Sequence, residues 1–203
     1  MRPEESEWPR SQRDILRRSQ KGKIMLRRIV CFSIVTVLFP TLVHAQCSVA
    51  SLKWPLPGTF NPSNISLGFG NNWVKSCGGL VKKHTGIDYP QNVGTTVRAA
   101  ASGWVRAAQL DPEDIGWVTI EHGCFTTVYW HINPSVVAGQ WINEGDPMGS
   151  VGYSPNFSPH LHFGIRRLPY SNTSNRGSLP QTSCNNDPAF PENFQNPLTV
   201  TFH

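Results

Sequence analysis

Charged residues are scarce in this chain, and its excess of positive charge is confined to one end. Asp, Glu, Lys and Arg make up 15% of the 203 residues, which is low for a coiled coil, and the 10% of aromatic residues is high for a disordered chain. Residues 1–45 hold 9 Lys and Arg against 4 Asp and Glu, which accounts for the whole net charge of +5, because residues 46–203 hold 9 of each. We therefore expect a globular domain with no nucleic-acid partner.

The chain also lacks an apolar run of the roughly 20 residues that cross a bilayer as a helix. The uncharged run Ile29–Val43 has 15 residues and is interrupted by Pro40. Arg27 and Arg28 precede this run and Ala45 follows it, a pattern that predicts a signal peptide cleaved after Ala45. An uncleaved anchor is the alternative interpretation.

This interpretation divides the chain into a signal peptide, residues 1–45, and a mature domain, residues 46–203. Met25 alone would begin a conventional signal peptide, so residues 1–24 are interpreted as an N-terminal over-extension. We expect the mature domain to be periplasmic or extracellular, without a stable membrane anchor, and the sequence indicates no obligate protein partner.

The cysteines include no C-x-x-C pair, which disfavours the alternative of a four-cysteine zinc site. Cys31 falls in the predicted signal peptide, and the mature domain retains Cys47, Cys77, Cys124 and Cys184. An even number of cysteines in an exported domain favours two disulfides. Sequence alone leaves three pairings possible, of which we predict Cys47 with Cys77 and Cys124 with Cys184.

Helical periodicity is nearly absent after residue 46, because Gly, Pro, Asn and Ser recur too often. Segments rich in Val, Ile, Thr and aromatic residues predict strands instead, with turns at Gly123-Cys124 and Gly145-Asp146. The predicted strands are Gly103–Leu110, Trp117–His122, Phe125–Ile132, His160–Arg167 and Leu198–Phe202. We expect a mainly β, loop-rich single domain of antiparallel sheets with few or no long helices.

Histidines carry the clearest chemical signal of the mature domain. His160 and His162 are two residues apart, so on a strand both imidazoles point to one face. His84 precedes Asp88 by four residues, and His131 lies on a predicted strand. Each feature alone has an ordinary explanation, namely accidental spacing, partly exposed strand histidines, or a hydrogen-bonded histidine at the edge of the core.

Together these side chains provide the donors of a hydrolytic zinc centre. Zn²⁺ accepts nitrogen and carboxylate oxygen ligands, and a catalytic site uses three protein ligands with a fourth position open to water. Two histidines and an aspartate make such a set, and the metal would lower the pKa of its bound water toward roughly 7. Two histidines would remain to move protons near neutral pH.

Several short motifs follow one another from about Trp54 to Leu198. They are Trp54-Pro-Leu-Pro-Gly58, Phe69-Gly70, His84-Thr-Gly-Ile-Asp88, Gly94-Thr-Thr-Val97, Ser102-Gly-Trp-Val105, Tyr129-Trp-His131 and Pro159-His-Leu-His-Phe163. In this order and spacing they resemble the lysostaphin-like (LytM-type) zinc endopeptidases of bacterial cell walls. The resemblance implies an antiparallel β fold with an open substrate groove.

The resemblance also implies the roles of individual residues. His84, Asp88 and His162 would bind one Zn²⁺, and His131 and His160 would be the catalytic pair that does not bind the metal. The implied reaction is hydrolysis of peptide bonds in peptidoglycan stem peptides or cross-bridges, with peptidoglycan peptides as the substrate. The alternative function is a non-catalytic binding module of the same fold that activates cell-wall amidases, in which the metal ligands are degraded.

The chain departs from the family pattern at two places. Asn71 and Asn72 stand where relatives often have an arginine, and Gly164 stands where many carry a glutamate. Neither place is an implied metal ligand, so the departures bear on substrate preference and on a supporting contact to the site. Of the other histidines, His122 is interpreted as structural, and the terminal His203 carries no signal.

Overall fold

The computed structural model of the chain describes residues 47–74, 81–111, 115–170, 190 and 193–203. The predicted signal peptide, Cys77 and Cys184 therefore lie outside the described residues. No helix within the described ranges is long and apolar enough to cross a membrane.

Strands dominate the described residues, and their only helices are two short 3-10 turns. The strands are β1 (Ser51–Leu52), β2 (Asn72–Val74), β3 (Val81–Lys83), β4 (Gly86–Pro90), β5 (Thr96–Arg98), β6 (Gly103–Asp111), β7 (Ile115–Glu121), β8 (Thr126–Trp130), β9 (Ile132–Pro134), β10 (Trp141–Ile142), β11 (Pro147–Val151), β12 (His160–Arg166), β13 (Phe194–Gln195) and β14 (Thr201–Phe202). The 3-10 turns are η1 (Pro62–Asn64) and η3 (Pro197–Thr199).

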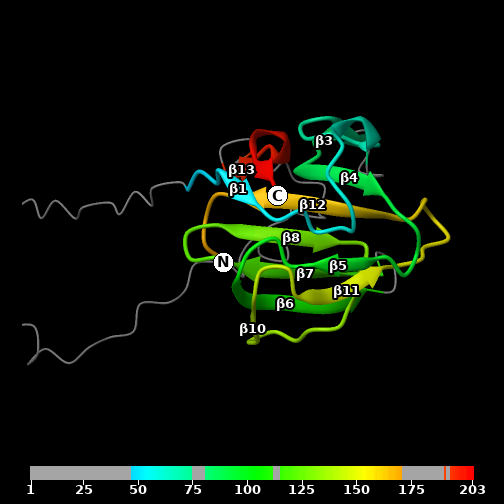
Figure 1. The fold of residues 1–203 in the computed structure, drawn as a ribbon. Coiled ribbons are helices and arrows are strands. Elements are labelled where there is room, and N and C mark those ends of the chain that lie inside the picture. The colour runs from blue at the N-terminus through cyan, green and yellow to red at the C-terminus, as the bar shows by residue number, and fades with distance from the viewer. Residues whose placement is uncertain (1–46, 75–80, 112–114, 171–189, 191–192) are drawn as a thin grey trace, which may run out of the picture. The chain divides into compact units, whose positions relative to one another are not determined.

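The main sheet has the order β10-β6-β7-β8-β12-β13, and β4 also pairs with β12. All its pairings are antiparallel. Strand β12 pairs with both β4 and β8 and lies between them, as Figure 1 shows. A smaller antiparallel sheet has the order β5-β11-β9. The predicted mainly β fold without long helices is confirmed, with one parallel exception where β1 pairs with β14.

The two faces of the main sheet have different contents. Leu161, Phe163 and Ile165 alternate along β12 toward the hydrophobic core, where all three are fully buried. The aromatic ring of Trp54 packs into the same core, with its centroid 4.9 Å from that of Tyr89. The opposite face of β12 therefore carries the polar alternation that begins with His160, and this face is available for chemistry.

Two predicted strands differ from the observed ones. Phe125–Ile132 is broken at His131, whose φ of 64° ends β8 and lets β9 start in another sheet. Leu198–Phe202 is shortened to Thr201–Phe202, because Asn196 caps η3 by accepting a hydrogen bond from the Leu198 N–H. The Gly123-Cys124 turn is confirmed, closed by the hydrogen bond from His122 N–H to Phe125 O.

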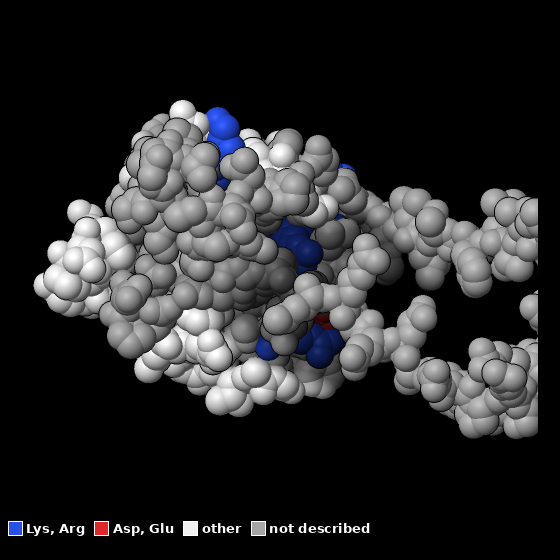
Figure 2. Space-filling model, turned by 180° about the vertical axis from the view of Figure 1, so that it is seen from behind, with Lys and Arg blue, Asp and Glu red and all other residues white. Residues whose placement is uncertain are grey.

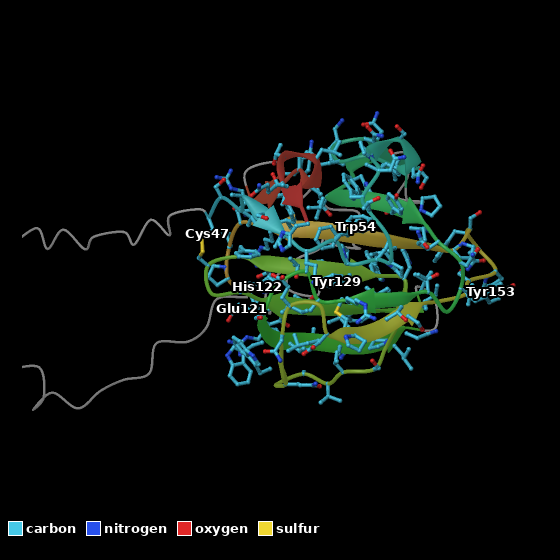
Figure 3. All side chains as sticks on the ribbon, viewed as in Figure 1. Cys47, Trp54, Glu121, His122, Tyr129 and Tyr153 are labelled. Atoms are coloured by element: carbon cyan, nitrogen blue, oxygen red, sulfur yellow. A yellow bond between two sulfur atoms is a disulfide. The ribbon has the colours of Figure 1, made fainter. Side chains whose placement is uncertain are left out.

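The predicted pairing of Cys47 with Cys77 is wrong, because Cys47 forms a disulfide with Cys124 across a Cα–Cα distance of 5.8 Å (Figure 3). Backbone contacts explain this partner. Cys47 N–H donates to Arg167 O, and the Arg167 side chain donates back to Cys47 O, so Cys47 is held just past the end of β12. The turn between β7 and β8 carries Cys124 close to that point, and the predicted pair Cys124 with Cys184 is therefore also wrong.

Basic side chains do not gather on the described surface seen in Figure 2. The Lys and Arg side chains there are separate from one another, and one lies beside a carboxylate. An ion pair of this kind joins Arg106 to Glu121, whose nearest atoms are 2.6 Å apart. This distribution agrees with the balanced charge of residues 46–203.

Candidate metal centre

Two adjacent strands, β4 and β12, and the segment just before β4 place three side chains that could hold a metal ion. The antiparallel register of β12 and β4 sets His162 directly opposite Asp88, and both point away from the hydrophobic core. His84 lies two residues before β4. Its backbone is held in place because Gly70 N–H donates to His84 O and His84 N–H donates to Asn71 O.

One nitrogen or oxygen atom from each side chain meets at a common point. His84 Nε2 lies 3.0 Å from Asp88 Oδ1 and 2.9 Å from His162 Nδ1, and the last two atoms are 3.0 Å apart. Donor atoms that share one tetrahedral Zn²⁺ at the roughly 2.0–2.2 Å of Zn–N and Zn–O bonds lie about 3.3–3.6 Å apart, which is close to the separations found here. The three residues therefore fit a small divalent cation.

The hydrogen bond of His84 Nδ1 determines that the other nitrogen, Nε2, turns a lone pair toward Asp88 and His162. Nδ1 lies 3.1 Å from Gly68 O, and a carbonyl oxygen can only accept, so neutral His84 carries its hydrogen on Nδ1. Its Nε2 then presents a lone pair toward the Asp88 carboxylate. Facing lone pairs repel unless a cation lies between them, which is the arrangement of a metal site.

The electrostatics of the cluster favour the protonation states that bind metals. Burial acts to raise the pKa of Asp88, but the hydrogen bonds and positive charge that His162 and His84 supply when they are protonated outweigh burial, and the pKa falls well below its ordinary value. Burial lowers the pKa of His162, against the opposing effect of Asp88. Near neutral pH the cluster therefore holds a carboxylate and a neutral His162, as metal coordination requires.

His131 and His160 lie together beside this cluster. Their ring centroids are 4.6 Å apart, and the His131 ring also stacks on Trp130 at 5.3 Å with the planes 7° apart. His160 Nε2 is 3.6 Å from Asp88 Oδ2, which is too long for a good hydrogen bond. The structure thus brings all five predicted site residues together, with three in the cluster and two next to it.

Phe157 is a site residue that sequence reasoning missed. Its ring centroid lies 4.5 Å from that of His131 and 5.5 Å from that of His160, so one side chain contacts both members of the pair. Phe157 lies between β11 and β12, three residues before His160. Its position near the histidine motif is the only sequence signal that could have indicated this contact.

His122 belongs to a separate chain of hydrogen bonds that leads from the surface into the core. Its Nδ1 donates to Ser102 O at 2.9 Å, and its Nε2 lies 2.7 Å from Thr127 Oγ1. Thr127 Oγ1 is 3.1 Å from Tyr129 Oη, which accepts from Ala100 N–H at 2.8 Å. Figure 3 shows His122 at the opposite end of the strands from Tyr153, which lies in the loop leading to β12. This placement fits the structural role expected of His122.

His203 also lies outside the cluster, as an exposed terminal residue. Its Nδ1 is 3.0 Å from Ser51 Oγ, and its Nε2 is 3.3 Å from Glu144 Oε1. These contacts tie the end of the chain to neighbouring surface residues and involve no predicted site residue.

Similarity to known proteins covers the part of the chain that carries the cluster. Residues 82–176 match the model of Peptidase family M23. The peptidoglycan DD-endopeptidase ShyC of Vibrio cholerae is 29% identical over 113 residues, which are 52% of this chain and 26% of that protein. Lysostaphin of Staphylococcus simulans is 28% identical over 148 residues, which are 69% of this chain and 28% of that protein.

The chain thus spans about a quarter of the length of these two curated relatives. Among solved structures, the catalytic domain of lysostaphin from Staphylococcus simulans is 24% identical to this chain. That match covers 66% of this chain and 88% of the lysostaphin domain, with a TM-score of 0.47.

Proposed function

Because the chain carries a Peptidase M23 domain, we propose that it is a zinc-dependent endopeptidase that hydrolyses peptide bonds in peptidoglycan stem peptides or cross-bridges. One observation carries this proposal. The three potential ligand atoms of His84, Asp88 and His162 converge within 2.9–3.0 Å, with the His131 and His160 pair beside them. A cluster of ligands together with groups that can move protons is what metal-assisted hydrolysis needs.

His84, Asp88 and His162 would hold one Zn²⁺ ion. When bound, Zn²⁺ supplies Lewis-acid polarisation of a carbonyl oxygen and lowers the pKa of a bound water. The Asp88 carboxylate would offset part of the charge of the ion, and the two imidazoles would donate lone pairs as neutral ligands. The outer N–H of His84 stays bonded to Gly68 O, which keeps that ring in its orientation.

His131 and His160 would perform the proton transfer and stabilise developing negative charge. His160 Nδ1 lies 2.8 Å from Ser158 O, so neutral His160 carries its hydrogen there and keeps a lone pair on Nε2. That Nε2 atom can accept a proton from the attacking water. His131, which packs against His160, would then donate a hydrogen bond to the oxyanion of the scissile peptide.

We also propose that the domain acts after export. The signal-peptide pattern of residues 1–45 supports this location, and the disulfide between Cys47 and Cys124 is a bond that persists in oxidising compartments. Amino-terminal sequencing of protein recovered from cells should find a start near Gln46. A start at Met1 or Met25 in the functional protein would contradict cleavage.

The proposal is tested by digesting defined cross-linked muropeptides with the purified mature domain and identifying the fragments by mass spectrometry. We expect cleavage at one type of peptide bond, its loss after chelation, and its return when zinc is restored. Asp88→Asn should lose both zinc and cleavage, whereas the matched His122→Gln should retain both. Stoichiometric zinc without cleavage of any muropeptide would refute the enzyme and leave a non-catalytic binding role for the domain.

A further inference from the structure

The outer nitrogen of His162 is left without a partner in the interior. Its Nδ1 faces His84 and Asp88, but its Nε2 is buried and has no hydrogen-bond partner among the described residues. An imidazole that binds a metal through Nδ1 carries its hydrogen on Nε2. The proposed ligand His162 therefore holds an unpaired buried donor, whereas the equivalent donor of His84 is bonded to Gly68 O.

Two glycines facing each other across β4 and β12 account for the missing acceptor. Gly86 pairs with Gly164, and a Cβ on either residue would point at His162 Nε2. At Gly86 the added Cβ would overlap the Phe163 carbonyl oxygen, so this position accepts no side chain.

Gly164 is different, because a side chain there would fit. A Cβ at this position would lie 3.6 Å from His162 Nε2, 3.4 Å from Thr85 O and 3.8 Å from Val128 Cβ, all ordinary contact distances. A hydroxyl on that Cβ would stand between a donor and an acceptor. It can accept from the His162 Nε2–H and donate to Thr85 O at the same time.

We propose that residue 164 is a positioning residue of the metal centre. Because Gly164 offers no acceptor to the Nε2–H of His162, the orientation of this ligand is not fixed by an outer hydrogen bond. This inference rests on the proposed metal site. An outer hydrogen bond fixes the orientation of a ligating imidazole and makes it more basic, and its loss usually costs 10–100-fold in metal affinity. Restoring such a bond should therefore strengthen a metal centre that natively lacks it.

The test measures zinc affinity by competition with a chromophoric chelator in wild type, Gly164→Ser and Gly164→Ala. The two variants add the same Cβ, and only serine adds an acceptor. We expect Gly164→Ser to bind zinc about ten-fold more tightly than wild type, and Gly164→Ala to stay within about two-fold of it. Equal affinity in the serine and alanine variants would overturn the inference while leaving the metal centre standing.

A measurement on the wild type keeps the inference testable if the serine variant fails to fold. In zinc-loaded protein, long-range proton–nitrogen NMR correlations report the Hε2 of His162 and the Hδ1 of His84, whose hydrogen bond to Gly68 serves as an internal reference. The His162 proton should resonate clearly upfield of the His84 proton, and it should move downfield in Gly164→Ser. A wild-type His162 proton at the shift of the reference would refute the inference. A protein that binds no zinc would refute the metal centre, and the inference with it.

Discussion

Replacing His160 and His162 separately distinguishes proton transfer from metal binding on a single strand. His162 Nδ1 lies within 3.0 Å of both other potential ligand atoms, and the ring is buried. His162→Ala removes one of three donors, so zinc affinity should fall by more than the roughly 100-fold that loss of an outer hydrogen bond costs. His160 Nε2 is 3.6 Å from Asp88 Oδ2, and the other oxygen, Oδ1, retains its contacts with His84 and His162 when His160 is replaced. We therefore expect His160→Ala to change zinc affinity only a few-fold.

Turnover, unlike zinc affinity, should fall sharply when His160 is replaced. His160→Ala should lower muropeptide cleavage by about 10²–10⁴-fold at saturating zinc, which corresponds to roughly 2.7–5.4 kcal/mol of transition-state stabilisation. His131→Ala should behave in the same way and keep its zinc. Metal content and cleavage are measured side by side, with circular dichroism to confirm that each variant is folded.

Two outcomes would refute this reasoning. Zinc loss in His160→Ala together with zinc retention in His162→Ala would mean that the two roles are exchanged. Undiminished cleavage in both His160→Ala and His131→Ala would exclude the proposed proton transfer, whatever the metal content.

The remaining predictions concern the parts of the domain that support the site. Tyr129→Phe removes the acceptor of the buried Ala100 N–H and should lower the free energy of unfolding by about 1–3 kcal/mol in urea titrations. Burial lowers the pKa of His122, so its contribution to stability is complete above the unfolded pKa of about 6.5 and is lost as pH falls below it; metal-free wild type should therefore lose more stability on acidification than His122→Gln. The disulfide of Cys47 and Cys124 leaves Cys77 and Cys184 for a second one, so the unreduced, denatured mature protein should show no free thiol and peptide mapping should join these two cysteines.

Local patterns in the sequence predicted what depends on neighbouring residues. The spacing of His160 and His162 placed both on one face of a strand, and the structure puts the core residue Leu161 between them on the other face. The break at His131 was not predictable, because histidine adopts positive φ only where its surroundings hold it there. The 3-10 turn at Pro197 had a readable signal, an asparagine before a proline, that competed with the β propensity of the following residues.

Contacts between distant segments were beyond any local pattern. The partner of Cys47 depends on where its backbone docks against Arg167, at a sequence separation of 120 residues. The contact of Phe157 with both histidines depends on the path of a loop, which no periodicity encodes. The family motifs predicted which residues meet, and the glycine at position 164 indicated an altered supporting contact, but neither the contacts of Cys47 and Phe157 nor the unpaired nitrogen of His162 could be read from them.

The pairing of β12 with β4 makes metal binding depend on the correct register of these strands. A slip of one residue between these strands would turn both histidines of β12 into the core and bring Leu161 and Phe163 to the site face. His84 and His162 are 78 residues apart, so no local segment of the unfolded chain can assemble the cluster. During refolding, zinc should therefore be captured only after the long-range pairing is complete, and a misaligned protein with the same strand content should remain metal-free.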